Sequence, residues 1–350
     1  MQRLYYFDYI RIVLILFVIF QHTGMAYVPV AEGWPIVYTG PLPFASDVII
    51  SSIGAISSAF AMALFLFISA YLLVGSFDRK GRRTFLRDRF ERIGVPLVAF
   101  SLFFWVLGGF GTFSFGYLWF LVALLFIAVV YSVWRGFKVT IPPVSCPGNG
   151  TLVLAALAVG AASFVVRIWY GIDDMVLWHG IEPAHLPLYV LMVVGGILAY
   201  RNGWLDVVAP SVAKVWGIIA AVTVCSVPVI FTAFGSATAG GFTLIALVTA
   251  FWEAFLGVSL CVSLLLVFKN RWNVAGRVKA ALARSVYAVY LIQLPIILIL
   301  QWWFIHGGIL LKGLPALTQF ILVGVLASVF CFLISNYIVR RIPYAKRILF

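Results

Sequence analysis

Charged residues are scarce in this chain of 350 residues: they make up 10% of it, whereas 64% of the residues are hydrophobic. In an average soluble domain about a quarter of the residues are charged and about half are apolar. The composition therefore excludes an ordinary soluble protein and predicts an integral membrane protein. We expect a single membrane-embedded domain over residues 1–350, with no soluble domain of useful size.

Cysteine is also scarce, and its placement is uninformative. The four cysteines are scattered, and they form neither a Cys-x-x-Cys pair nor a Cys/His spacing typical of metal ligands. The sequence therefore predicts neither a zinc site nor a set of disulfides.

Long hydrophobic runs account for nearly the whole length. A membrane span needs about 20 mainly apolar residues. Ten runs qualify: 9–28, 48–75, 93–110, 117–135, 151–170, 185–200, 213–234, 241–268, 285–305 and 314–339. The first run follows a short basic segment, as in a signal peptide, but it is long and has no convincing Ala-x-Ala site after it, so we interpret it as a retained helix. The predicted fold is an all-α bundle of about ten transmembrane helices.

The basic residues indicate the orientation of this bundle. With ten spans, nearly all Lys and Arg residues fall on the side of the N-terminus, most densely in 76–92 and 269–284, and only Arg167 and Lys312 fall on the other side. Short loops rich in Lys and Arg stay cytoplasmic. We therefore expect a multi-pass protein of the plasma (inner) membrane with both termini in the cytoplasm. The net charge of +13 is then mostly a topology signal, and no nucleic-acid partner is expected.

Two ionisable residues, Arg11 and His22, lie within the first hydrophobic run. Eleven residues correspond to about three helical turns, so both side chains share one face, roughly 16 Å apart along the axis. Ionisable groups are costly in hydrocarbon and by default mark a functional site. The alternative is that Arg11 reaches the interface as a topology anchor and that His22 is a hydrogen-bonded core residue.

Two further candidates lie in later runs. Glu253, near the middle of the eighth run, would pair with a cation such as Arg167 or His22, have a raised pKa, or serve catalysis. Trp119 would either line a cavity or belong to an aromatic belt at the membrane interface.

The connecting segments contribute two other sets. Arg89 and Arg92 lie one helical turn apart where the chain enters the third run, and guanidinium groups bind phosphates in a bidentate manner. The alternative is a basic anchor that contacts lipid headgroups. On the opposite side, His179, Glu182 and His185 would line an acceptor site; a metal site there is a weaker alternative, and no metal is expected.

These features are typical of a protein that moves either a solute or a chemical group across the bilayer. A secondary transporter or exporter would use His22 and Glu253 as a proton relay. A non-catalytic membrane partner of a polysaccharide assembly machine is a third interpretation. The residues alone leave these alternatives open.

Six segments, in order over residues 5 to about 340, carry further motifs. They are Asp8-x-x-Arg11 with His22 eleven residues after the Arg, residues 65–73, residues 89–96, residues 117–121, residues 187–201 and residues 287–293. Together they resemble the membrane acyltransferase-3 family, which includes bacterial glycan O-acetyltransferases and osmoregulated-glucan succinyltransferases. Ala70 stands where that family usually has Gly, and Tyr117 and Gln293 stand where His is common. We therefore assign no proton transfer to Tyr117 or Gln293.

The resemblance implies transfer of an acyl group, acetyl or succinyl, from cytoplasmic acyl-coenzyme A to a hydroxyl of an extracytoplasmic carbohydrate or glycan. In this interpretation Arg11, Arg89 and Arg92 hold the phosphates of the coenzyme, and Trp119 shapes the passage for the acyl group.

The same resemblance suggests the catalytic residues. His22 would act as a general base on the acceptor hydroxyl or as a transient acyl acceptor. Glu253 would fix the tautomer of the histidine or polarise the reacting groups. The acceptor and the oligomeric state are not predicted.

Overall fold

The computed structural model describes residues 4–28, 34–108, 113–137, 142–176, 181–307 and 313–349. Of the described residues, 82% are helical and none forms a β-strand. An isolated antiparallel bridge joins Val176 and Ile181. The all-helical prediction is confirmed.

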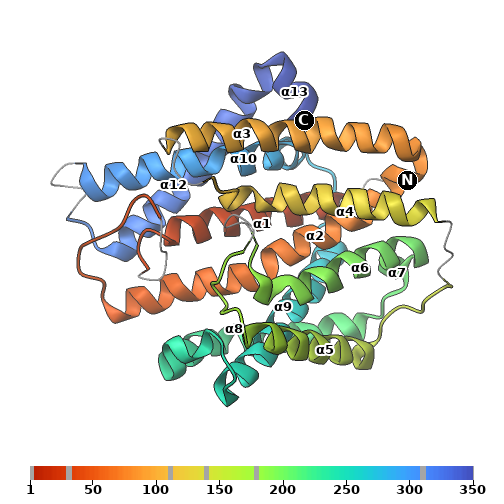
Figure 1. Cartoon of the computed structure of the whole chain (residues 1–350), viewed down its shortest axis with the longest axis horizontal. Helices are drawn as coiled ribbons and strands as arrows, with labels where there is room; N and C mark the ends of the chain where they lie inside the picture. Colours follow the sequence, from red (N-terminus) through yellow and green to blue (C-terminus); the bar gives the residue numbers. More distant parts are fainter. Residues whose placement is uncertain are drawn as a thin grey trace. The chain divides into compact units, whose positions relative to one another are not determined.

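Each predicted hydrophobic run corresponds to a helix (Figure 1). The long helices are α1 (Tyr5–Gly24), α2 (Phe44–Arg89), α3 (Val95–Leu107), α4 (Trp119–Gly136), α5 (Asn149–Arg167), α6 (Leu186–Asn202), α8 (Pro210–Phe234), α9 (Leu244–Arg271), α10 (Arg277–His306) and α12 (Ala316–Tyr337). Two short helices are α7 (Trp204–Val207) and α13 (Pro343–Leu349). Among the described residues, nine helical stretches are long and apolar enough to cross a membrane, because α2 and α3 form one stretch that contains two of the predicted runs.

The segment 76–92 differs from the connecting loop that the sequence suggests, because it is almost entirely helical. The helix is broken only at Gly81, whose φ of 71° and ψ of 166° lie where a residue with a Cβ is strained. A π-helical turn, Phe90–Gly94, then leads into α3. Pro96 lacks an N–H and its ring would clash with the carbonyl of Arg92 in a regular helix, which gives a physical reason for the wider turn.

Large apolar side chains cover the outer surfaces of several helices. On α3, for example, Val98 is 58% exposed and Val106 is 52% exposed, and on α5 Leu154 is 68% exposed. In water such continuous apolar surfaces would promote association. Hydrocarbon is the solvent that suits them, and helices satisfy their own backbone hydrogen bonds there. The chain is a multi-pass membrane protein.

The chain divides into two compact units, and the division falls within α2, α8 and α9. The first unit contains residues 1–61, 224–235 and 264–350, and the second contains residues 62–223 and 236–263. The expectation of a single domain over the whole chain stays a prediction.

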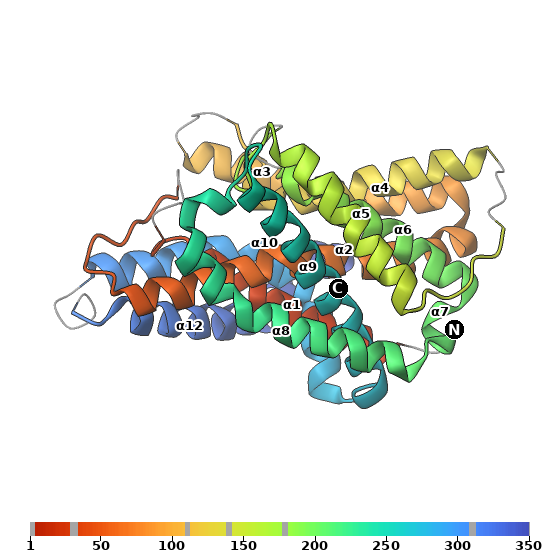
Figure 2. The ribbon, with the colours of Figure 1, turned by 90° about the horizontal axis from the view of Figure 1, so that it is seen from below.

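In the first unit, α1 packs against both α10 and α12, which themselves lie side by side (Figures 1 and 2). The ring of Phe20 on α1 meets that of Phe320 on α12 edge to face, with 5.6 Å between centroids. These two side chains belong to an apolar cluster that also contains Tyr27 and Ile305. The cluster closes the C-terminal end of α1, where His22 is located.

In the second unit, α6 approaches the C-terminal part of α2 through Gly196. A Cβ at Gly196 would lie 2.4 Å from the carbonyl oxygen of Phe67 and 3.0 Å from the Cβ of Ala70, so the two backbones come close only because this residue has no side chain. Ala70 is the residue that replaces the usual Gly of the second-run motif. The smallest residues of two separate motifs therefore meet at one helix contact. In the same unit α5 packs against α6.

Candidate functional site

The first candidate residues lie on α1, as their spacing predicts. Arg11 forms an ion pair with Asp8 one turn earlier, so the Asp-x-x-Arg motif is a local salt bridge. The Arg11 side chain keeps 33% of its surface exposed, whereas Asp8 keeps 12%. About a third of the Arg11 side chain thus remains accessible. His22 lies in the last turn of the same helix.

The imidazole of His22 has two close neighbours from other segments of the first unit. The indole of Trp34 is stacked on it, with 6.2 Å between centroids and an angle of 17° between the planes. The side chain of Gln293, from α10, adjoins the same imidazole. Two neutral side chains therefore contact the imidazole: Trp34 at its face and Gln293 at its edge.

Gln301 links these neighbours to the end of α1. Its Oε1 accepts a hydrogen bond of 2.9 Å from Nε1 of Trp34, and its Nε2 donates one of 3.0 Å to the carbonyl oxygen of Thr23. Thr23 directly follows His22, so one buried amide positions both the stacked indole and the backbone beside the imidazole. On the other side of His22, Gln21 bonds the hydroxyls of Ser57 (2.8 Å) and Ser58 (2.7 Å) on α2. The end of α1 is thus held by polar contacts in an apolar surrounding.

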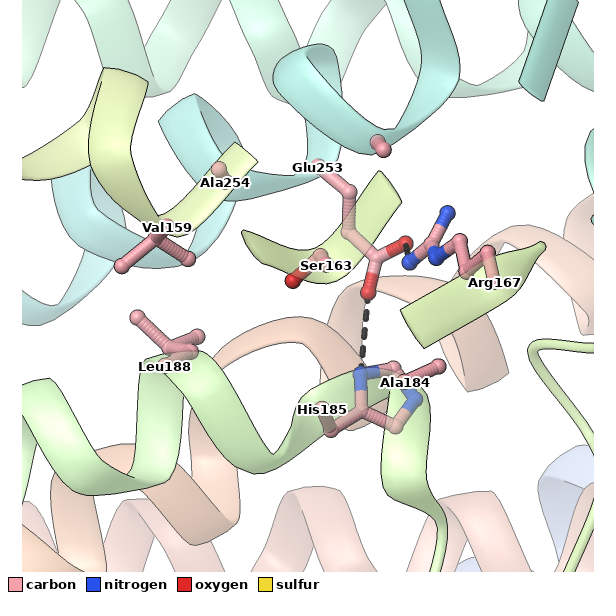
Figure 3. Close-up of a pocket in the computed structure, with 9 residues that line it drawn as sticks. Val159, Ser163, Arg167, Ala184, His185, Leu188, Glu253 and Ala254 are labelled. Atoms are coloured by element: carbon pink, nitrogen blue, oxygen red, sulfur yellow. Dashed lines mark hydrogen bonds and ion pairs between the residues drawn. The ribbon is translucent and has the colours of Figure 1, made fainter. Parts of the chain in front are cut away.

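A second polar cluster lies in the second unit, around Glu253 on α9 (Figure 3). One carboxylate oxygen of Glu253 pairs with Nη2 of Arg167, at the end of α5. The other lies 3.0 Å from Nδ1 of His185, the last residue of the 3₁₀ turn Pro183–His185. Nε2 of His185 lies 3.4 Å from a carboxylate oxygen of Glu182. Charges of alternating sign therefore join α5, α6 and α9.

The cluster becomes more accessible toward Glu182. The side chain of Arg167 is 1% exposed and that of Glu253 is 12% exposed, whereas that of Glu182 is 31% exposed. Arg167, Glu253 and His185 also line a small cavity with room for about one water molecule. The buried charges are thus compensated by one another, with little solvent.

Two carboxyl groups outside the helical spans are also affected by this cluster. Burial raises the pKa of Asp173, and the positive charge of His185 opposes that rise. Burial likewise raises the pKa of Glu182, again opposed by His185 and supported by the neighbouring carboxylates. Both groups therefore take up protons more readily than ordinary carboxyl groups.

The cluster decides between the partners that the sequence leaves open for Glu253. Arg167 was one of the two predicted partners, and the structure confirms the Arg167–Glu253 pair. His185 was expected only as a residue of an acceptor loop; its link to Glu253 was missed, and the only signal was its position three residues after Glu182. His179 of the same set lies outside the described residues. A catalytic role for Glu253 stays a prediction.

Trp119, the first residue of α4, lies beside this cluster. Its ring is stacked on that of Tyr189 with 5.4 Å between centroids, and the Tyr189 ring lies 6.1 Å from that of His185. Tyr117, which replaces a histidine of the family motif, makes an edge-to-face contact with Phe104. In the described structure, Tyr117 therefore packs as an aromatic residue against α3.

The two arginines at the entry to α3 differ in their surroundings. The guanidinium of Arg89 lies 5.2 Å from the centre of the Phe85 ring, and its side chain is partly buried. Arg92 is exposed within the π-helical turn. The part of both arginines in donor binding stays a prediction. Within the described ranges, no group of three or more His, Cys, Asp or Glu side chains is arranged to hold a metal ion.

Comparison with known proteins gives one match. A family model described as an acyltransferase domain matches residues 4–336. Neither the curated proteins nor the solved structures yield a match. The matched range covers nearly the whole chain, including Arg11, His22 and Glu253. The chain therefore belongs to the acyltransferase-3 family and is a membrane acyltransferase.

Proposed function

We propose that this enzyme moves an acetyl or succinyl group from cytoplasmic acyl-coenzyme A to a hydroxyl of a carbohydrate or glycan outside the plasma (inner) membrane. The observation that carries the proposal is the setting of His22. Its imidazole is placed at the end of a membrane helix between Trp34 and Gln293, on a chain of the acyltransferase-3 family.

The chemistry of acyl transfer suits an imidazole in this position. The ring nitrogen either removes the proton of the acceptor hydroxyl or attacks the thioester and carries the acyl group briefly. Both routes need an unhindered ring of fixed orientation. Stacking on Trp34 and the polar contacts on either side of His22 supply that orientation without adding a charge.

Binding of the donor requires cations for its phosphates. Arg89 and Arg92 present two guanidinium groups near the start of α3, and Arg11 is paired with Asp8 but still partly exposed. Guanidinium forks match phosphate geometry better than an ammonium does. With Lys- and Arg-rich segments in the cytoplasm, both termini and each of these arginines face the cytoplasm, where acyl-coenzyme A is available.

Glu253 and Trp119 are assigned to the acceptor half of the reaction. Both oxygens of Glu253 are engaged, by Arg167 and by His185, so the histidine that Glu253 orients is His185. Trp119 extends the same cluster through Tyr189. Under the proposed topology this cluster lies near the outer ends of α5 and α6, where the acceptor arrives.

The proposal is tested with purified enzyme and radiolabelled acetyl- or succinyl-coenzyme A. The release of free coenzyme A and the transfer of label are measured for the wild type, for His22→Ala and for His306→Ala. His306 is an exposed histidine at the end of α10, so its variant is the matched control.

We expect turnover by the wild type and the His306 variant, and loss of at least 99% of it in a folded His22→Ala protein. Full activity of His22→Ala would disprove the assigned role of His22. A folded wild type that neither binds nor cleaves either donor would disprove the assignment of the donor.

A further inference from the structure

Gln293 is a completely buried amide on α10, with an exposed fraction of 0%. Its side chain is hydrogen-bonded to the imidazole of His22, but its Nε2 donates to no described residue. Gln301, eight residues later on the same helix, is buried to the same extent, but both of its amide atoms are hydrogen-bonded. The helix therefore offers an internal comparison between a structural glutamine and an unsatisfied one.

An unsatisfied buried amide destabilises the folded protein, and most buried polar groups in proteins have a partner. An apolar side chain of similar size would avoid this penalty. The unpaired Nε2 of Gln293 therefore suggests a ligand that supplies a hydrogen-bond acceptor. The neighbouring imidazole of His22 indicates the identity of this ligand, because the acyl group reacts beside that ring in the proposed function.

We propose that the amide N–H of Gln293 donates a hydrogen bond to the carbonyl oxygen of the acyl group while it is transferred. The inference rests on the proposed function of His22. A side-chain amide is a suitable donor for an oxygen on which negative charge develops, and its effect is greatest where water is excluded. Gln293 is neutral and keeps both amide protons, so it acts equally at every pH of interest.

In the covalent route the acyl group passes from the thioester sulfur to the imidazole. A nitrogen of His22 forms a bond to the carbonyl carbon, and the carbonyl oxygen becomes negatively charged and accepts the N–H of Gln293. The carbon–sulfur bond then breaks, and the coenzyme thiolate takes up the proton that the imidazole loses. In the general-base route His22 takes the proton of the acceptor hydroxyl while the acceptor oxygen bonds to the carbonyl carbon. The carbon–sulfur bond then breaks, the imidazole passes that proton to the coenzyme thiolate, and Gln293 has the same part. The Oε1 of Gln293 remains free to accept from the imidazole in either route.

The test compares Gln293→Leu with Gln301→Leu in the full-length enzyme, with acetyl-coenzyme A as donor. For Gln293→Leu we expect kcat to fall about 10²- to 10³-fold, as when a comparable donor is removed from an acyl-transfer site. The KM for acetyl-coenzyme A should change by less than about threefold, since the bond strengthens mainly in the transition state.

Thermal stability distinguishes this role from a structural one. Gln293→Leu removes an amide whose Nε2 is unsatisfied, so its unfolding midpoint should stay close to that of the wild type. Gln301→Leu removes the partner of Trp34 and of the Thr23 carbonyl, so its midpoint should fall. The pH profile of Gln293→Leu should keep its shape at a lower level, and Gln293→His, which restores an N–H donor, should recover part of kcat.

Three results would overturn the inference: a kcat of Gln293→Leu within about fivefold of the wild type, a loss of kcat that follows a loss of stability, or a shifted pH profile with full activity at its new optimum. His22→Ala is measured in parallel. If His22→Ala is active, the assigned role of His22 fails, and with it the premise of this inference. If His22→Ala is inactive while Gln293→Leu is active, only the role of Gln293 fails.

Discussion

The buried charges around Glu253 predict a large effect of a single substitution. In Glu253→Ala, the guanidinium of Arg167 and the imidazole of His185 lose the carboxylate that they share. Because the Arg167 side chain is only 1% exposed, water cannot replace the lost oxygens. Removing one member of a buried ion pair typically costs about 3–5 kcal/mol. For a chain of this length, unfolding as one unit, that corresponds to an unfolding midpoint lower by about 4–7 °C.

The assay is thermal unfolding in detergent, with Asp78→Ala as the control. Asp78 pairs with Arg135 at 3.4 Å, but both side chains are a third exposed or more, so its loss should cost at most about 1 kcal/mol. The double variant Arg167→Met/Glu253→Leu removes both main charges and should recover much of the stability. An effect of Glu253→Ala no larger than that of Asp78→Ala, or a double variant less stable than either single one, would refute the reasoning.

Two further outcomes are expected. Arg92→Lys keeps the charge but loses the bidentate geometry, so the KM for acyl-coenzyme A should rise about tenfold or more. The KM of the exposed control variant Arg83→Lys should equal that of the wild type. Equal KM values for the two variants would contradict a phosphate-binding role for Arg92. Glu182→Gln should stabilise the enzyme at neutral pH. The folded-state pKa of Glu182 is raised above its ordinary value of 4.5, so the charged carboxylate destabilises the folded protein, and this destabilisation is fully present above the folded pKa. The neutral amide removes it. Thermal unfolding between pH 4 and 7.5 should show this difference shrinking as the pH falls through the folded pKa toward the ordinary value, and a difference independent of pH would contradict the assignment.

The fold class follows from local properties of the sequence. Each apolar run is long enough to span a bilayer, and in hydrocarbon such a run must satisfy its backbone within itself, so ten runs predict helices without knowledge of their packing. The position of Arg11 and His22 on one helix also follows from spacing alone. Where the local pattern is weak the prediction is less accurate: the basic segment 76–92 suggests a loop, but only Gly81 leaves helical geometry.

The candidate residues could be found from the sequence because charged and polar groups are rare within apolar runs. Their partners could not be found in the same way. Glu253 had two candidate cations, and the sequence has no feature that chooses Arg167, from α5, or adds His185, from the start of α6. Such pairs depend on which helix faces meet, and that choice is made by contacts between distant residues, such as the one between Gly196 and Ala70.

The sequence by itself therefore determined the type and the approximate positions of the membrane elements, because length, polarity and helical period act within one segment. Only the tertiary structure decided that Trp34 is stacked on His22 and that Gln293, rather than Gln301, is the unsatisfied amide beside it. Both glutamines lie on one helix, and the residues next to each of them in the sequence are mostly apolar. They differ because hydrogen bonding depends on the atoms that other segments place around each amide. The sequence pattern of one helix does not show where those atoms lie.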